Sequence, residues 1–328
     1  MDKASPDEAS ADGTSPSHGG ADKACLVLVN GGAGAHTPGH DAQALAQSLR
    51  THGLDAELVI TRETDELATR ARAAVARGCA LVVAGGGDGT INQVASAVAD
   101  SSSTLGILPL GTLNHFAKDL GIPMDVDDAI ALLAGGGERV VDTASVNGRL
   151  FLNNSSIGLY PALVRDREQQ QQRLGRGKWP AFAFACVAAF RRYPFLSVRV
   201  QVDGRELVRR SAFVFVGNNA YEMEGLDIGK RERLDAGLLC LVVSRDVGRW
   251  GLLGLALRAL FGRLGAAQDL EVLHAQAFRI ETGHARLSVS TDGEVCDLET
   301  PLNYCSRPRS LRVRVPADAG GADAGATH

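Results

Sequence analysis

The sequence has few of the features that mark secreted, membrane-spanning or metal-stapled proteins. Its longest apolar stretch, Trp179–Phe190, falls short of the about 20 residues that a membrane-spanning helix needs. No N-terminal stretch combines a basic start with an apolar core, so we expect no secretion signal. The six cysteines form no CxxC pair and lie mostly in apolar runs. We therefore expect reduced thiols without a disulfide framework or a zinc site, and a cytoplasmic location.

The chain also lacks a strong overall charge. Its net charge is −4 over 328 residues, and most of the excess acid lies in the two tails, 1–23 and 317–328. The remaining chain is close to neutral, so no global field attracts nucleic acid, and no nucleic-acid partner is expected. Both tails contain almost no large apolar side chains, so both are predicted to be disordered and are excluded from the fold.

From the first tail to about residue 144, short apolar strands alternate with helical segments. Such a pattern indicates a parallel sheet that is covered by helices on both faces, and hence an α/β domain. The strands are predicted at Cys25–Val29, Leu54–Ile60, Ala80–Ala84 and Thr104–Leu108, and the helices at about 39–53, Glu63–Arg77, Thr90–Ala99, Leu113–Leu120 and Val126–Leu133.

After about residue 145 the period of the apolar residues changes to two. Alternation from Leu196 to Val202, the turn pair Asp203-Gly204 and a following apolar run, Leu207–Val216, predict a β-hairpin with a type I′ turn. The second part of the chain is therefore predicted to be a mainly antiparallel β domain. Further strands are predicted at Leu238–Val243, Leu270–Ile280, Leu287–Ser290, Val295–Leu298 and Leu311–Val315, with helical insertions at about 162–191 and 248–264.

The segment 83–92, Val-Ala-Gly-Gly-Gly-Asp-Gly-Thr-Ile-Asn, lies between an apolar strand and a helix. Glycines let backbone N–H groups approach phosphate oxygens, and the helix N-terminus adds partial positive charge. A carboxylate at Asp88 is unusual in an anion site unless a metal ion or a transferred proton accompanies the phosphate. The alternative is a tight turn in which Asp88 or Thr90 caps the helix.

Two more polar segments follow predicted parallel strands, Asn30-Gly-Gly-Ala-Gly34 and Leu108-Pro-Leu-Gly-Thr-Leu-Asn114. The carboxyl ends of parallel strands meet at one edge of the sheet, where open α/β sheets bind ligands. The chain has neither a Walker A pattern nor a GxGxxG motif, which argues against an ordinary P-loop or dinucleotide-binding fold.

Three motifs in this order resemble the diacylglycerol kinase catalytic family: Gly-Gly-Asp-Gly-Thr at 86–90, Pro-Leu-Gly-Thr-x-Asn at 109–114, and Asp-Gly-Glu at 292–294. The likeness is closer to the bacterial soluble lipid kinases, relatives of sphingosine kinases, and covers about residues 24–316. It implies a nucleotide-binding α/β domain at 24–144, a β-sandwich acceptor domain at 145–288 with helical insertions, and C-terminal strands at 289–316 that return toward the first domain.

The resemblance also implies roles for individual residues, with ATP and Mg²⁺ as cofactors. Asp292 matches the general base, Glu294 lies near the metal and phosphates, and Asp88 belongs to the Mg²⁺ network. The choice of base between Asp88 and Asp292 stays open from the sequence. The implied nucleotide contacts are Asn30, Thr61, Gly86, Gly87, Gly89, Thr90, Gly111 and Thr112.

The chain departs from the family pattern at three places. Gly31 stands where relatives often have proline, and His115 where many have aspartate. Relatives often carry two consecutive acids that hold a structural Mg²⁺ in some members. Here Asp235, the metal ligand implied by the resemblance, is followed by Ala236.

We therefore expect an ATP- and Mg²⁺-dependent lipid kinase that transfers the γ-phosphoryl group to a hydroxyl of a diacylglycerol-like or long-chain-base lipid. An NAD kinase-like enzyme is the first alternative, disfavoured because that family's Asn-Glu pair is missing after the glycine loop. The second alternative is a nucleotide- or lipid-binding regulator without catalysis.

A lipid kinase also needs access to its acceptor, so the expected partner is a lipid at a membrane surface, with a homodimer left open. The arginine-rich segment Arg165–Arg192 flanks the apolar run and suits peripheral membrane contact, although a solvated helix leading into a core helix explains it equally well. The polar segment Asn218–Gly225 is either part of the acceptor cleft or an ordinary polar loop.

Overall fold

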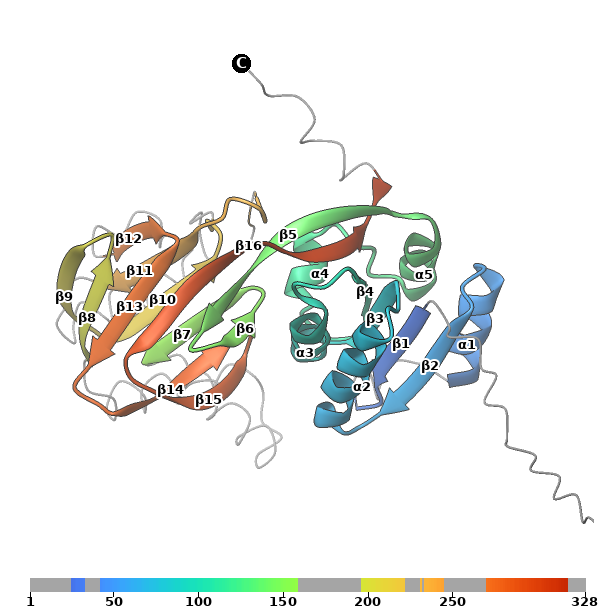
Figure 1. Ribbon diagram of the computed structural model, residues 1–328, viewed down its shortest axis with the longest axis horizontal. Coiled ribbons are helices and arrows are strands. Elements are labelled where there is room, and N and C mark those ends of the chain that lie inside the picture. The colour runs from blue at the N-terminus through green and yellow to red at the C-terminus, as the bar shows by residue number, and fades with distance from the viewer. Residues whose placement is uncertain are drawn as a thin grey trace, which may run out of the picture.

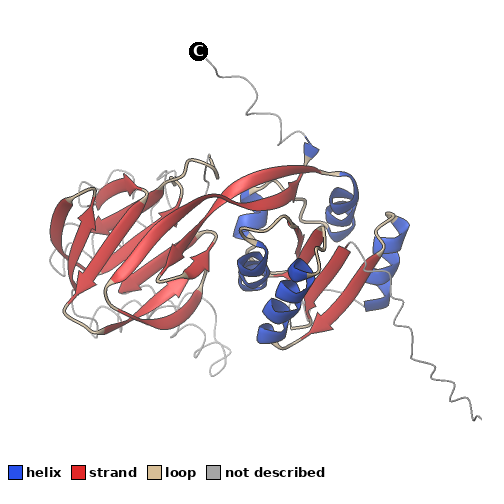
Figure 2. Cartoon of the chain, viewed as in Figure 1, coloured by secondary structure: helices blue, strands red, loops and turns tan. Residues whose placement is uncertain are grey.

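The computed structural model describes residues 25–32, 42–158, 196–221, 231, 233–244 and 270–317. Within these residues the helices gather around one part of the molecule, and the other part consists of strands (Figure 2). The predicted fold class is confirmed: a parallel α/β region comes first and an antiparallel β-sandwich follows. The predicted helical insertions lie outside the described residues.

The α/β region contains four parallel strands in the order β2-β1-β3-β4. Helices α2 and α3 pack together, while α1 contacts α5, so the helices form two layers with the sheet between them (Figure 1). The side chains of β1, β3 and β4 are almost entirely buried, as expected for a sheet covered on both faces. The elements are β1 (Cys25–Asn30), α1 (Ala42–Thr51), β2 (Ala56–Thr61), α2 (Thr64–Ala76), β3 (Leu81–Gly86), α3 (Asp88–Val98), β4 (Thr104–Pro109), α4 (His115–Asp119) and α5 (Val126–Gly135).

The strand order has a switch point between β1 and β3. From β1 the chain crosses to β2 on one side, and from β3 it crosses to β4 on the other. Open α/β sheets bind their ligands outside the carboxyl ends of the strands at such a point. The segments after Asn30 and Gly86 flank it, so the fold itself places two of the three predicted loops where a ligand is expected.

The sandwich packs one half of a ten-stranded sheet, in the order β16-β13-β8-β9, against a six-stranded sheet, in the order β12-β11-β10-β7-β14-β15. Its core combines buried side chains from both sheets, among them Val200 and Phe278 from the first and Val216 and Leu241 from the second. The strands are β6 (Arg149–Phe151), β7 (Asn154–Gly158), β8 (Leu196–Val202), β9 (Arg205–Ser211), β10 (Phe213–Asn218), β11 (Leu239–Ser244), β12 (Leu270–Ala275), β13 (Ala277–Thr282), β14 (Arg286–Thr291) and β15 (Glu294–Glu299).

Two long strands join the regions. β5 (Gly137–Val146) pairs antiparallel with β16 (Leu302–Val315) along most of its length, and Figure 1 shows this ribbon running from one region into the other. β16 also pairs with β13 of the sandwich and, at Val313, with β4 of the parallel sheet. Of the segment 289–316, it is thus β16 that reaches the first region, whereas β15 pairs with β14. The predicted domain boundaries stay predictions.

Two predicted strands are wrong because each spans a change of sheet. Leu207–Val216 is divided between β9 and β10, and Leu270–Ile280 between β12 and β13. The apolar pattern continues through both crossings, so periodicity could not detect them. At the first crossing the Ser211 hydroxyl bonds to the Phe213 carbonyl and the Ser244 hydroxyl, which satisfies polar groups freed where the ladder stops.

The predicted hairpin at Asp203-Gly204 is confirmed. β8 and β9 pair up to Val202 and Arg205, and both turn residues have positive φ, 46° and 73°. This is the type I′ geometry that Asp-Gly favours. Among the described helices, none is long and apolar enough to cross a bilayer.

Candidate active site

The three loops predicted from the sequence meet at one edge of the parallel sheet. Asn30 ends β1 beside Thr61 of β2, and the Gly31 amide donates to the Thr61 carbonyl at 2.8 Å. The Asn30 amide also donates to the Thr90 hydroxyl at 3.3 Å, which joins the first loop to the glycine loop. The Thr61 hydroxyl donates to Glu66 at 2.5 Å, so its predicted nucleoside contact stays a prediction.

Glycines of the second and third loops have no room for a side chain, at Gly111 because the two loops touch and at Gly86 because of Thr90 in the same loop. A Cβ atom added at Gly111 would lie 2.3 Å from the Cα atom of Gly87, and one at Gly86 would lie 2.5 Å from the Thr90 hydroxyl. Buried Asn114 holds the third loop in place by accepting from the Gly111 amide at 3.1 Å and donating to the Gly111 carbonyl at 2.9 Å. Thr112 lies exposed in the same loop.

Gly111→Ala is expected to weaken nucleotide binding about tenfold or more while the protein stays folded. The added methyl group has no room against the backbone of Gly87, so the two loops must separate where the phosphates are expected to bind. Overpacking typically costs about 1–3 kcal/mol of stability, and a similar loss in binding free energy corresponds to about tenfold in Kd per 1.4 kcal/mol. Calorimetric titration with ATP and a thermal melt measure both effects. Gly135→Ala is the matched control, because its Cβ would meet nothing within 4 Å. Equal ATP affinity in both variants would contradict a nucleotide site at this contact.

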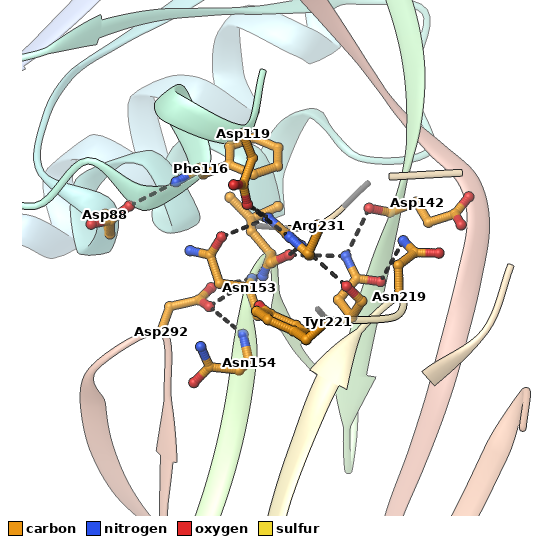
Figure 3. Close-up of polar contacts among 12 residues, drawn as sticks. Asp88, Phe116, Asp119, Asp142, Asn153, Asn154, Asn219, Tyr221, Arg231 and Asp292 are labelled. Carbon is orange, nitrogen blue, oxygen red and sulfur yellow. Dashed lines mark hydrogen bonds and ion pairs between the residues drawn. The ribbon is translucent and has the colours of Figure 1, made fainter. Parts of the chain in front are cut away.

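Asp88 opens α3, directly after the helix cap at Gly87, and its side chain is partly buried. One carboxylate oxygen accepts the Phe116 amide of α4 at 3.3 Å (Figure 3). The carboxylate thus links the glycine loop to the helix after the third loop. This contact does not by itself need a negative charge.

Asp292 lies in the turn between β14 and β15, yet its carboxylate reaches into the protein. One oxygen accepts the amides of Asn153 at 2.8 Å and Asn154 at 3.1 Å; the other accepts the Leu152 amide at 2.7 Å and the Asn92 side-chain amide at 2.5 Å. Burial raises the pKa of the Asp292 carboxyl, and these four donors oppose the rise. Because Asn92 belongs to α3, the carboxylate bridges the two regions. An ordinary turn residue has no such environment.

Glu294 begins β15 directly after this turn and lies against the glycine loop. A Cβ atom built at Gly89 would be 2.8 Å from its Oε1 atom, and its other oxygen accepts from the Arg149 guanidinium at 2.9 Å. The sequence motifs 86–90 and 292–294, about 200 residues apart, therefore meet across the boundary between the two regions.

The residues present fit a nucleotide with Mg²⁺. Backbone amides of a glycine loop and the start of α3 suit phosphate oxygens, and carboxylates at Asp88 and Glu294 flank that loop. Mg²⁺ bound with nucleotides commonly uses one or two carboxylates plus phosphates and water. The described residues contain no group of three or more His, Cys, Asp or Glu that could hold a metal ion.

Asp235, the second predicted metal ligand, lies between arginines. Its two oxygens are 3.2 Å from Arg233 and 3.7 Å from Arg139. Two guanidinium groups neutralise the carboxylate that a cation would use. The metal role of Asp235 stays a prediction.

The described part of the polar segment, residues 218–221, forms internal hydrogen bonds. Asn218 is buried and its amide donates to the carbonyls of Asp142 and Leu152. The Tyr221 hydroxyl donates to the Asn153 carbonyl at 2.8 Å, and burial raises the pKa of Tyr221 to about 12, which keeps that donor protonated. Residues 222–225 and the arginine-rich segment lie outside the described residues.

Sequence reasoning missed three side chains that complete the site: Asn92, Arg149 and Arg231. Asn92 lies two residues after Thr90 of the glycine motif, so the motif itself could have drawn attention to it. Arg149 and Arg231 give no local signal, because each acquires its role from residues far away in the chain.

Comparisons with known proteins agree with this geometry. Residues 24–146 match the model of the diacylglycerol kinase catalytic domain, and residues 158–315 match the YegS C-terminal NAD kinase beta sandwich-like domain. A probable lipid kinase YegS-like of Pseudomonas aeruginosa is 30% identical, covering 90% of this chain and 95% of its own. One of Pseudomonas fluorescens is 28% identical, covering 92% and 98%.

Solved structures support the fold. A putative diacylglycerol kinase from Bacillus anthracis superimposes with a TM-score of 0.69 at 24% identity, covering 90% of this chain and 98% of its own. Yeast NADH kinase gives a TM-score of 0.50 at 11% identity, with coverage of 92% and 89%. With both family models matched in order and a full-length relative at 30% identity, this chain belongs to the YegS-like branch of the diacylglycerol kinase catalytic-domain family and is a phosphotransferase with an alcohol group as acceptor.

Proposed function

We propose that this chain is an ATP- and Mg²⁺-dependent lipid kinase that phosphorylates a hydroxyl of a diacylglycerol-like or long-chain-base lipid. The observation that carries the proposal is that Glu294 lies against Gly89 of the 86–90 loop, while Asp292 is bonded to Asn92 in the helix that follows this loop. The loop expected to hold phosphate and a partly buried carboxylate with a raised pKa therefore come from two regions of the chain and lie close together. The names of the Pseudomonas relatives agree with a lipid acceptor.

In the proposed reaction, the acceptor hydroxyl oxygen forms a bond to the γ-phosphorus while the bond to the β-phosphate oxygen breaks and ADP leaves. The hydroxyl proton passes to a carboxylate, which we assign to Asp292. Bound Mg²⁺ would neutralise charge on the phosphates, held by Asp88 and Glu294. The loop amides hold the phosphates, since such transfer depends mainly on positioning and charge stabilisation.

Asp292 can accept a proton only if one of its four hydrogen bonds gives way. Three donors are backbone amides of consecutive residues, 152–154, and are fixed by the chain. The fourth is the Asn92 side-chain amide, which also donates to the Leu150 carbonyl at 3.3 Å and so keeps an acceptor when it leaves Asp292. We therefore propose that the Asp292 oxygen bonded to Asn92 accepts the proton. The hydroxyl of the lipid acceptor would take the place of the Asn92 amide at this oxygen.

The test is phosphate transfer from labelled ATP with Mg²⁺, offered to a panel of diacylglycerol, a long-chain base and NAD. Labelled phospholipid supports the proposal. Labelled NADP with unlabelled lipid would favour the NAD kinase alternative. Binding of ATP or lipid without any transfer would favour the regulator.

We also propose that the enzyme meets its acceptor at a membrane surface through the segment Arg165–Arg192, which lies outside the described residues. Binding to anionic vesicles should weaken as salt rises from 0.05 M, because charges are screened over about 10 Å at 0.1 M. Neutralising four arginines should reduce vesicle binding in sedimentation assays and leave activity on detergent-dispersed lipid. Unchanged vesicle binding would contradict the proposal. The four are Arg173, Arg176, Arg191 and Arg192.

A further inference from the structure

A buried arginine joins the two regions beside the candidate site. The Arg231 guanidinium contacts one oxygen of Asp119, in α4, through two nitrogens at 2.7 and 2.8 Å. Both side chains are almost completely buried, with exposed fractions of 0% and 7%. Arg231 belongs to the chain between β10 and β11 of the sandwich, whereas Asp119 belongs to the nucleotide region (Figure 3).

On the nucleotide side, this ion pair holds the helix that contacts Asp88. The Phe116 amide of α4 donates to Asp88, and the Phe116 ring lies 5.9 Å from the centre of the Arg231 guanidinium. α4 has only five residues and contains both Phe116 and Asp119. A shift of Asp119 is therefore passed directly to the group that contacts Asp88.

On the sandwich side, Arg231 holds the segment that contacts Asp292. It donates to the Leu152 carbonyl at 2.7 Å and to the Asn153 side-chain oxygen at 2.8 Å. The amides of these same two residues donate to Asp292 at 2.7 and 2.8 Å. One guanidinium thus fixes the contacts of both candidate catalytic carboxylates.

A buried ion pair is a weak source of net stability, because desolvation of the two charges offsets much of their attraction. The planar guanidinium instead fixes the relative positions of the groups that it contacts, since its N–H donors have fixed directions. A misplacement of about 1 Å in an active site can reduce turnover about 100-fold. The directions of the Arg231 bonds, toward α4 and toward 152–153, match such a positioning role.

We propose that Arg231, held by Asp119, is a positioning residue that sets Asp88 and Asp292 at the separation needed for phosphoryl transfer. The inference rests on the proposed function. Among the residues that the structure describes, Arg231 contacts none of the loops assigned to the nucleotide, so it acts on turnover and leaves ATP binding to the first region.

The test compares Arg231→Lys and Asp119→Asn with the wild-type chain. Lysine at position 231 keeps the positive charge but lacks the planar group of N–H donors. Asparagine at position 119 keeps the shape of the side chain and one acceptor oxygen. We expect kcat to fall about 10- to 100-fold in each folded variant, with the Kd for ATP changed less than twofold. Because each residue acts through the other, the double variant should lose little more than the worse single variant.

The control is the ion pair between Arg209 and Glu271, which has the same contact of two guanidinium nitrogens with one carboxylate oxygen, both at 3.0 Å, within the sandwich. Arg209→Lys and Glu271→Gln should lower the melting temperature at most and leave kcat unchanged.

Wild-type kcat in folded Arg231→Lys and Asp119→Asn would overturn the inference, as would an equal loss of kcat in the controls. If Arg231→Lys fails to fold, Asp119→Asn decides. A wild-type chain that transfers no phosphate to any lipid would overturn the proposed function, and this inference with it.

Discussion

Asp292→Asn is expected to lower kcat by about 10²–10⁴-fold, the range of a general base, with little change in the affinity for ATP. The amide keeps the size of the carboxylate and suits the turn, since Asp292 has a φ of 49° and asparagine tolerates that region. It cannot accept the acceptor's proton. The loss should therefore fall on the chemical step, as single-turnover measurements can show.

The same substitution should also destabilise the fold. One of the two oxygens of Asp292 becomes an NH₂ group that faces two donors, either those of Asn153 and Asn154 or those of Leu152 and Asn92. Leaving buried donors without an acceptor costs about 1–3 kcal/mol. Chemical denaturation measures this cost, and kcat must be normalised to the folded fraction.

Asp203→Asn is the matched control. Asp203-Gly204 and Asp292-Gly293 are both Asp-Gly hairpin turns with positive φ at both residues. Asp203 lies at the far end of the β8–β9 hairpin, so its variant should keep the wild-type kcat. A folded Asp292→Asn enzyme with normal kcat would remove Asp292 as the base.

The Asp203 and Asp292 turns show which features of the site could be predicted from the sequence and which could not. The dipeptide predicted a hairpin at Asp203, and the second dipeptide, at Asp292, lies between the predicted strands Leu287–Ser290 and Val295–Leu298. The difference between them arises from contacts with Leu152, Asn153 and Asn92, which depend on how β7 and α3 are placed against β14. Only the resemblance to a kinase family distinguished Asp292, and the structure supplies the physical reason.

The parallel region was predictable because its signals are local. Each buried strand is a continuous apolar run that ends at a polar or glycine-rich loop, and the edge of the sheet collects those loops. The sandwich was harder, since a strand that changes sheet keeps its alternation. β5 and β7 were not predicted at all, and β7 contains the hydroxyls of Ser155 and Ser156 at buried positions. Ser155 is satisfied there by the Tyr304 hydroxyl at 3.1 Å, a partner 149 residues away.

The buried ion pair of Arg231 and Asp119 marks the limit of sequence reasoning. A charged residue in a polar stretch suggests a solvated loop, because arginine is almost never fully buried without a partner. Here the partner lies 112 residues away in α4. Tertiary packing alone creates the site of this pair.

Asp88→Asn is expected to keep the fold and to lower turnover by about 100-fold or more. The only role seen for its carboxylate inside the described protein is to accept the Phe116 amide at 3.3 Å, which an asparagine oxygen can do equally well. Helix α3 should also tolerate the change, since asparagine is favoured near helix starts. What the variant loses is a negative charge beside the phosphate loop, which only a metal ion or a proton can use.

The dependence of the rate on Mg²⁺ concentration distinguishes a role of Asp88 in holding the metal ion from a role in accepting the proton. If Asp88 helps to hold the ion, as we propose, Asp88→Asn should need more Mg²⁺ for half-maximal activity, whereas Asp292→Asn should not. Asp125→Asn is the control, because Asp125 caps α5 through the amides of Asp127 and Asp128, away from the phosphate loop, and asparagine caps equally well. A folded Asp88→Asn enzyme with normal turnover and normal Mg²⁺ dependence would contradict the kinase assignment of this loop. Reduced turnover with unchanged Mg²⁺ dependence would instead make Asp88 the base, and Asp292→Asn should then retain most of its kcat.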